Sequence, residues 1–219
     1  RTLKTEARYF SRAATDHLAA VFGGIGELRT REGLPLVIDA GPGGSIDVLF
    51  RARVFQSDEP LKEALCRPDR HLGSPPARAA AAGRMNARGI SVFYGATSPE
   101  VALAEVRPPV GSRVALATFR ILRPLRLLDL AALENAFDGG SVFDPTLRQR
   151  LERVSFLQSL GRKMTRPVMP DDQEFDYLST QAVADFLATE NDPILDGILF
   201  ESTQSEEGYN LVLFHRASR

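Results

Sequence analysis

The stretch from Gly83 to Val106, GRMNARGISVFYGATSPEVALAEV, carries the strongest local structural signals in this chain. Its centre, Ile90 to Tyr94, is rich in β-branched and aromatic residues and predicts a strand. Ser98 and Pro99 then supply the N-cap and the first position of a helix that is mostly apolar. The segment therefore predicts a strand, a short loop and a helix in direct succession.

Strands and helices follow one another irregularly on both sides of this segment. Helices are predicted for residues 5–29, 59–66, 130–136 and 145–163. The segment 173–189 is predicted to hold a further helix that begins around Ser179. Strands are predicted for residues 46–54, for two runs within 112–129, and for 197–201 and 209–215. Because strands and helices do not alternate regularly, the order predicts an α+β fold rather than a doubly wound sheet.

The composition excludes several classes of protein. The chain has 219 residues and a formal net charge of −1, so it lacks the basic excess of a general nucleic-acid binder. No apolar run approaches the roughly 20 residues that span a bilayer, and the N-terminal residues lack the pattern of a signal peptide. We therefore expect a cytoplasmic protein that binds neither nucleic acid nor membrane directly.

Cysteine and histidine usage argues against a metal or disulfide site. The only cysteine, Cys66, excludes an internal disulfide and indicates a reducing compartment. We expect it to be a small buried apolar residue. The three histidines, His17, His71 and His215, show no ligand spacing, so no metal is expected.

Four polar residues stand in positions where chemistry could occur. Glu105 comes late in the apolar helix, where it either reaches solvent or points into a polar pocket. Arg51 lies in a predicted strand and shares a face with Arg53, opposite to Phe50. Tyr94 ends a buried strand, and Ser202 follows another strand, where serine is common in turns. Each has an ordinary structural explanation when it is considered alone.

The order of these motifs resembles the RES domain family, which is named for an arginine, a glutamate and a serine. The resemblance covers roughly residues 46–216. The motifs that carry it are Phe50-Arg51, Gly-Arg-x-Asn at 83–86, Phe-Tyr-Gly-Ala at 93–96, Ala-Leu-Ala-Glu-Val at 102–106, Phe-Glu-Ser at 200–202 and Tyr-Asn-Leu-Val-Leu-Phe at 209–214.

This resemblance implies a fold, a substrate and a partner. The fold would be similar to that of ADP-ribosyltransferases, with split mixed β-sheets flanked by helices. Residues 1–40 would be an N-terminal helical segment and residues 41–219 the RES domain. NAD⁺ would be the substrate, with no separate cofactor, and the bond between nicotinamide and ribose would be cut. Members often act as toxins in bacterial toxin–antitoxin pairs with an Xre-type antitoxin protein. Segments 1–40, 58–82 and 131–172 are longer here than in the family's compact toxins and could support a homo-oligomer.

The implied chemistry assigns a role to each residue. Glu105 would stabilise the ribosyl cation and bind a ribose hydroxyl. Arg51 is the first candidate to bind the pyrophosphate, and Arg84 is the second. Tyr94 would stack on nicotinamide or orient the ribose. Ser202 would bind substrate and hold the glutamate, without acting as a nucleophile.

The sequence offers further candidate binding residues and allows more than one activity. Asn86 and Asn210 lie in the matching motifs and are candidates for substrate binding. Ser179, a rival of Ser202, and its neighbour Gln181 resemble a family segment, although Ser179 is also a plausible helix N-cap. The acceptor could be water, phosphate or a protein that receives ADP-ribose. A non-catalytic partner-binding module is the alternative from another class.

Overall fold

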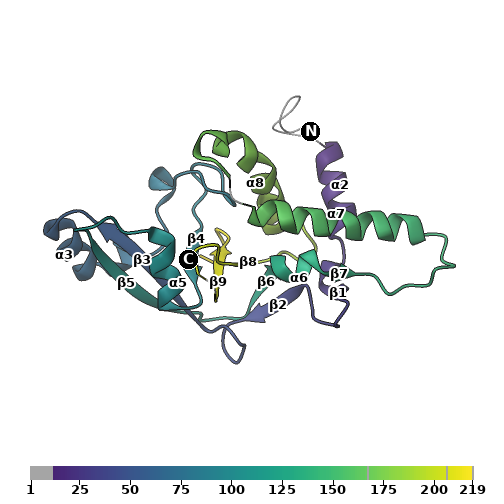
Figure 1. Cartoon of the computed structure of the whole chain (residues 1–219), viewed down its shortest axis with the longest axis horizontal. Helices are drawn as coiled ribbons and strands as arrows, with labels where there is room; N and C mark the ends of the chain where they lie inside the picture. The colour runs from purple at the N-terminus through teal and green to yellow at the C-terminus, as the bar shows by residue number, and fades with distance from the viewer. Residues whose placement is uncertain (1–11, 167, 206, 219) are drawn as a thin grey trace. The chain divides into compact units, whose positions relative to one another are not determined.

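A computed structural model describes residues 12–166, 168–205 and 207–218. The chain forms two compact units, each assembled from separate stretches of the sequence. The first unit comprises the described residues up to 38, residues 83–87 and residues 128–195. The second comprises residues 39–82, 88–127 and the described residues from 196 onward. Helices and sheets occur together without regular alternation, which confirms the predicted α+β class (Figure 1).

The first unit is mainly helical. Its helices are α2 (Arg12–Phe22), α6 (Leu130–Glu134), α7 (Leu147–Thr165) and α8 (Gln173–Thr189), with 3-10 turns at Ile25–Glu27 and Pro170–Asp172. Its two-stranded antiparallel sheet pairs β1 (Arg29–Thr30) with β7 (Ala136–Phe137). The buried positions of α7, which include Leu157, Leu160 and Met164, recur every three or four residues, so the helix buries one face.

The second unit contains most of a seven-stranded sheet. Its strands are β3 (Val48–Phe55), β4 (Phe93–Ala96), β5 (Arg113–Arg120), β8 (Gly197–Glu201) and β9 (Tyr209–Leu213). Its helices are α3 (Asp58–Cys66), α4 (Pro68–His71) and α5 (Pro99–Val106), with a 3-10 turn at Ala77–Ala79. The strand order is β2-β6-β8-β9-β4-β3-β5, and the chain passes between the units within β2 (Val37–Ala40) and β6 (Leu125–Asp129).

The two faces of β3 and β5 pack against different helices. On one face, Phe50 and Ala52 pack with Val101 and Ala102 of α5. On the other face, Phe55 packs with Ala64 of α3 and with Leu72, which directly follows α4. Because successive strand residues point to opposite faces, the register fixes which side chains share the face covered by α5.

Several predicted boundaries need correction. Among the described residues, only Arg12–Phe22 of the predicted 5–29 helix is α-helical, because the chain turns at Gly23 and Gly24; residues 5–11 lie outside the described residues. The strand predicted at 90–94 lies at Phe93–Ala96, where it pairs with β9. Cys66 was expected to be buried but is exposed, because α3 buries only Ala64 against the sheet and Cys66 is its last residue.

Gly161 allows α6 and α7 to approach closely within the first unit. A Cβ at this position would lie 2.7 Å from Cγ of Glu134 and 3.1 Å from the carbonyl oxygen of Leu130. Both contacts are tighter than ordinary van der Waals packing, so a side chain at position 161 requires the helices to shift.

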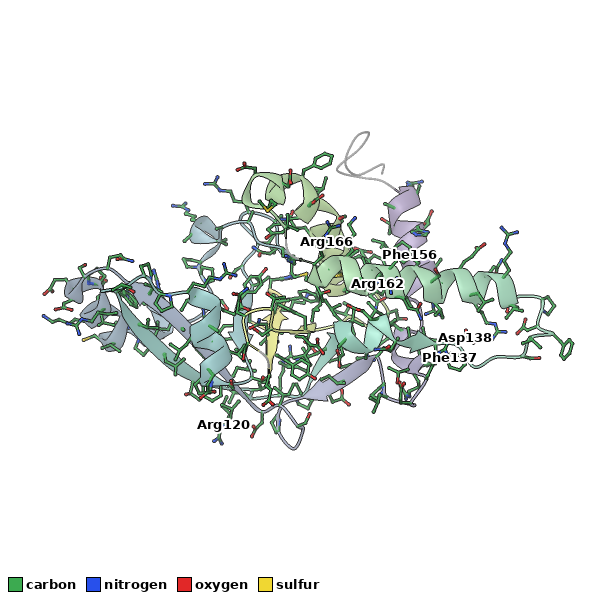
Figure 2. All side chains as sticks on the ribbon, in the orientation of Figure 1. Arg120, Phe137, Asp138, Phe156, Arg162 and Arg166 are labelled. Atoms are coloured by element: carbon green, nitrogen blue, oxygen red, sulfur yellow. The ribbon has the colours of Figure 1, made fainter. Side chains whose placement is uncertain are left out.

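Basic residues gather at the C-terminal end of α7. Arg162 and Lys163 lie in its last turn and Arg166 follows it; Figure 2 labels both arginines. The three side chains are exposed. Positive charge at this end complements the negative end of the helix dipole.

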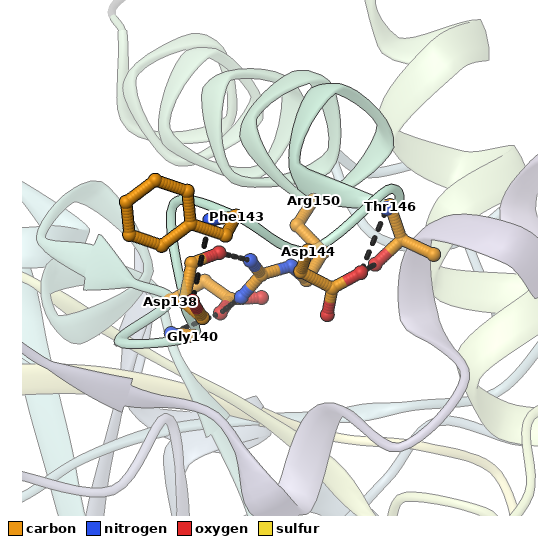
Figure 3. A network of polar contacts seen from close by, with 7 residues as sticks. Asp138, Gly140, Phe143, Asp144, Thr146 and Arg150 are labelled. Carbon is orange, nitrogen blue, oxygen red and sulfur yellow. Dashed lines mark hydrogen bonds and ion pairs between the residues drawn. The ribbon is translucent and has the colours of Figure 1, made fainter.

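The loop of residues 138–146 is held together by its own polar contacts (Figure 3). Arg150 of α7 donates from Nη1 to Asp138 at 2.6 Å and from Nη2 to the Ser141 carbonyl at 2.7 Å. Asp144 accepts from both the backbone N–H and the hydroxyl of Thr146 at 2.8 Å. The contacts anchor the loop on the first turns of α7.

Candidate functional site

The position of helix α5 on the sheet is determined by its N-cap and by the packing of its apolar residues. Ser98 is its N-cap, as predicted, and accepts a hydrogen bond from the Val101 N–H at 3.3 Å. Val101 and Ala102 are buried against the sheet. Glu105 follows Val101 by about one helical turn, so its side chain leaves the helix near the same edge of the sheet.

Two neutral side chains hold one oxygen of Glu105. The amide Nδ2 of Asn210 donates to Oε1 of Glu105 at 2.5 Å, and the hydroxyl of Ser202 donates to the same oxygen at 3.4 Å. The other oxygen, Oε2, has no hydrogen-bond partner among the described residues, and Glu105 is exposed. The carboxylate is therefore fixed at one oxygen and accessible at the other.

Asn210 is aimed at Glu105 by the register of the sheet. It pairs with Ala96 across the β4–β9 ladder and with Phe200 across the β8–β9 ladder. Its side chain is only 6% exposed. A buried carboxamide requires a hydrogen-bond partner, and Glu105 provides one. Asn210 thus connects the sheet to the carboxylate.

The turn of residues 202–208, of which residues 202–205 and 207–208 are described, joins β8 to β9 and approaches α5 at Gly208. At its end, the Tyr209 N–H donates to the hydroxyl of Thr97 at 3.0 Å, and the Thr97 N–H donates to the Tyr209 carbonyl at 2.9 Å. Gly208 has a φ of 105°, and a Cβ there would lie 2.6 Å from Cγ2 of Val101. This close approach brings Ser202 to Glu105.

Tyr94 lies on the same face of the sheet as Asn210. It pairs with Val212 on β9, two residues from Asn210, so the two side chains are diagonal neighbours. Such neighbours in antiparallel strands are separated by roughly 7–8 Å. The structure thus brings Tyr94, Glu105, Ser202 and Asn210 to one face.

Arg51 lies on the opposite face of this sheet. It pairs with Ala117, donates from Nη1 to the carbonyl of Gly73 at 3.0 Å, and lies 5.3 Å from the ring centre of Phe93. Burial lowers the pKa of Arg51, with a smaller effect from the charge of Arg53. Arg53 donates to the carbonyl of His71 at 2.6 Å.

Arg53 thus fastens the end of α4 to the sheet, and Arg51 fastens the segment that follows it. The two arginines share a face, as predicted. The sheet separates Arg51 from Glu105, and its predicted contact with pyrophosphate stays a prediction.

Arg84 belongs to the first unit, where it closes the end of α7. Its Nη1 donates to the carbonyls of Met164 at 2.8 Å and Arg166 at 2.6 Å. Its guanidinium also lies 5.4 Å from the ring centre of Tyr177. These carbonyls have no partners within the helix, so the arginine acts as a C-terminal cap.

Helix α8 holds the backbone around Arg84. Thr180, which is buried, donates to the Arg84 carbonyl at 2.6 Å, and the amide of Gln181 donates to the Gly83 carbonyl at 2.8 Å. Asn86 is buried in the same short segment and donates to the Ala87 carbonyl at 3.3 Å. Arg84, Asn86 and Gln181 are therefore brought together.

Ser179 does not take the position predicted for it. Helix α8 begins at Gln173, so the interpretation of Ser179 as an N-cap is wrong; the helix continues without interruption through this residue. Its hydroxyl donates to the Asp176 carbonyl at 3.3 Å, one turn earlier in the same helix. A substrate contact of Ser179 stays a prediction.

The sequence reasoning missed Tyr177, Thr180, Arg107 and Gln204. Thr180 stands between two residues that it did single out, and a threonine at a buried helical position is a signal for a hydrogen bond to backbone. Arg107 precedes two prolines and offered no such signal. Within the described residues, no group of three or more His, Cys, Asp or Glu side chains could hold a metal ion. No helix among them has the length and apolar character to cross a membrane.

The fold and site define an α+β protein with an accessible, oriented carboxylate beside a sheet. The profile of the RES domain family matches residues 50–219. The chain therefore belongs to the RES domain family, as the motifs indicated. This family is associated with NAD-utilising enzymes. No curated protein and no solved structure gave a significant match.

Proposed function

We propose that this chain is an NAD⁺ glycohydrolase that cleaves the bond between nicotinamide and ribose. The observation that carries the proposal is Glu105, whose Oε1 accepts from Asn210 and Ser202 while Oε2 is left accessible. Membership of a family associated with NAD-utilising enzymes gives the substrate class.

Cleavage requires stabilisation of a ribosyl cation. The bond between C1′ of the ribose and N1 of nicotinamide breaks, and its electron pair leaves with nicotinamide as a neutral molecule. Water then bonds to C1′ and loses a proton, which yields ADP-ribose. An oriented carboxylate next to C1′ lowers the energy of the oxocarbenium-like transition state. Oε2 of Glu105 would supply this charge and accept a hydrogen bond from a ribose hydroxyl.

The neighbours of Glu105 have supporting roles in the proposal. Asn210 and Ser202 hold the carboxylate in one orientation, so little reorganisation is needed during the reaction. Tyr94, on the same face, would stack on nicotinamide or orient the ribose. The first unit contributes the other predicted substrate-binding residues, which are Arg84, Asn86, Ser179 and Gln181. An Xre-type partner protein and a homo-oligomer also stay predictions.

Product analysis tests the proposed activity and identifies the acceptor. The purified chain is incubated with NAD⁺, with and without inorganic phosphate, and nicotinamide and the ribosyl product are separated by chromatography. We expect stoichiometric nicotinamide and ADP-ribose. A phosphorylated ADP-ribose would establish a phosphorylase, and label transferred from tagged NAD⁺ to protein would establish an ADP-ribosyltransferase. Intact NAD⁺ would contradict the proposal and favour a non-catalytic module.

A further inference from the structure

Arg107 adopts an unusual backbone conformation directly after α5. Its φ of 40° and ψ of 63° lie in the left-handed region, and among the described residues it is the only residue other than glycine with a positive φ. Glycine is the usual residue at such a helix end because it has no Cβ. An arginine in this place therefore carries a conformational cost, and residues strained in this way cluster at functional sites.

A chain of hydrogen bonds connects Arg107 to Glu105. The Nε of Arg107 donates to Oε1 of Gln204 at 3.0 Å. The N–H of Gln204 donates to the Ser202 hydroxyl at 3.2 Å, and this hydroxyl donates to Glu105 at 3.4 Å. This series of hydrogen bonds ends in a charged side chain on each side, Arg107 and Glu105. Gln204 and Ser202 of the turn therefore position both the guanidinium and the carboxylate.

The charge of Arg107 is not neutralised by a carboxylate among the described residues. The only hydrogen-bond partner of its side chain there is the neutral amide of Gln204, which accepts from Nε, so both terminal Nη groups are available. Two other exposed arginines of this unit are paired with carboxylates: Arg113 with Asp58 and Arg123 with Asp196. Arg107 is exposed, and its Nη pair is the part of a guanidinium that grips two oxygens of a phosphate.

We propose that Arg107 binds the pyrophosphate of NAD⁺, and that Gln204 is its positioning residue. This inference rests on the proposed function and names a contact for the anionic part of the same substrate. Arg107 and Glu105 belong to one hydrogen-bonded chain, whereas Arg51 lies across the sheet from Glu105. Arg107 binds the two linked phosphates while Glu105 faces the ribose.

The first experiment removes the charge and measures the kinetics of nicotinamide release. In Arg107→Gln we expect the KM for NAD⁺ to rise about tenfold, with kcat changed much less, because an exposed charge-assisted contact to substrate is lost. Nicotinamide riboside, which has no phosphate, should be cleaved equally by wild type and variant. Arg70→Gln on α4 is the matched control, an exposed arginine replaced in the same way, and should leave both substrates unaffected.

Arg107→Gly separates substrate binding from backbone stability. Glycine relieves the left-handed conformation, so the variant should be at least as stable as wild type while showing the same rise in KM. An unchanged KM for NAD⁺ in either Arg107 variant would overturn the proposal.

Gln204→Glu tests the positioning role. A carboxylate at this position pairs with Arg107 and repels phosphate, so the KM for NAD⁺ should rise further than in Gln204→Ala, with thermal stability retained. The double variant, Arg107→Gln with Gln204→Ala, should have nearly the same KM for NAD⁺ as Arg107→Gln alone, because Gln204 acts through the arginine. Full additivity would contradict this role.

Equilibrium binding keeps the inference separate from the proposed activity. Calorimetry with inorganic pyrophosphate and with ADP-ribose should show binding to wild type and about tenfold weaker binding to Arg107→Gln. If NAD⁺ is not cleaved but this difference is found, the proposed function fails and the anion site stands. If wild type binds neither ligand, or the variant binds both equally well, the anion site is overturned.

Discussion

Glu105 is exposed at the end of an apolar helix, yet its orientation is fixed. Asn210 and Ser202 donate to one oxygen, and neither carries a charge that would pair with the carboxylate. A salt bridge would compete with a developing cation on the substrate, whereas two neutral donors leave the negative charge available. This arrangement favours a role in charge stabilisation over a role in stability.

Replacement of Asn210 by alanine should affect the chemical step. Loss of the 2.5 Å bond frees the carboxylate, so we expect kcat for nicotinamide release to fall about tenfold and KM to change little. The free energy of unfolding should fall by about 1 kcal/mol, as for one buried hydrogen bond. Asn135→Ala, which removes an exposed asparagine bonded to the Ala131 carbonyl, is the control for activity. An unchanged kcat in Asn210→Ala would contradict the role of Asn210.

Glu100 should make stability depend on pH in the acid range. A hydrogen bond from its own backbone N–H, and then one involving Ser98, lower its pKa from the ordinary value of 4.5. A carboxyl group with a lowered pKa stabilises the fold above the unfolded pKa, and this stabilisation is lost as pH falls through the folded pKa. Between pH 6 and pH 3.5, wild type should therefore lose more thermal stability than Glu100→Gln. Parallel curves would contradict this effect.

At the scale of elements, α5 and the turn of residues 202–208 form one structural unit around Glu105. Gly208 and Gly111 both have positive φ, but only Gly208 approaches a neighbour closely, at Val101. Both substitutions by alanine should reduce stability by about 1 kcal/mol because of the backbone conformation. Gly208→Ala should also displace the turn and lower nicotinamide release, which Gly111→Ala should leave unchanged. Equal activity of both variants would argue against a functional role of this contact.

The close approach of α6 and α7 gives a second prediction for packing. Gly161→Ala should lower the free energy of unfolding by about 1–3 kcal/mol, because the new Cβ meets Glu134 and Leu130. Ser159→Ala, at an exposed position of the same helix, should have little effect or stabilise slightly. Urea unfolding monitored by circular dichroism measures both. A gain in stability for Gly161→Ala would show that the helices separate without cost.

The sequence predicted those elements whose signals are local. Ser98 and Pro99 predicted the start of α5 correctly, and the last helix ends at Thr189 as predicted, although it begins at Gln173 rather than around Ser179. The strand near Tyr94 was displaced because its bounds depend on pairing with β9, more than 100 residues later. Strand alternation placed Arg51 and Arg53 on one face, but only long-range packing reveals that α5 covers the other. The separation of Arg51 from Glu105 could not be inferred from order along the chain.

At the scale of the whole molecule, each compact unit draws on separate stretches of sequence. The family match of residues 50–219 includes parts of both units, and helix α2 precedes it. The motifs at 93–106 and 200–214 are far apart in the chain but meet in the second unit, where β4 pairs with β9 and Ser202 contacts Glu105.

Expression in bacterial cells tests whether the proposed activity occurs inside a living cell. If the chain consumes NAD⁺, induction should lower cellular NAD⁺ before growth stops, and Glu105→Gln should relieve both effects. Extraction and enzymatic measurement of NAD⁺ at successive times gives the order of events. Growth arrest with an unchanged NAD⁺ content would point to another target.

The most direct test of the central claim compares two glutamates of the same helix. Nicotinamide release from NAD⁺ is measured for wild type, Glu105→Gln and Glu100→Gln at neutral pH, with thermal unfolding of each variant as the control for folding. We expect Glu105→Gln to reduce kcat by about a hundredfold or more, as for other losses of transition-state charge stabilisation, and Glu100→Gln to retain activity. Glu105→Gln with the turnover of wild type would contradict the account.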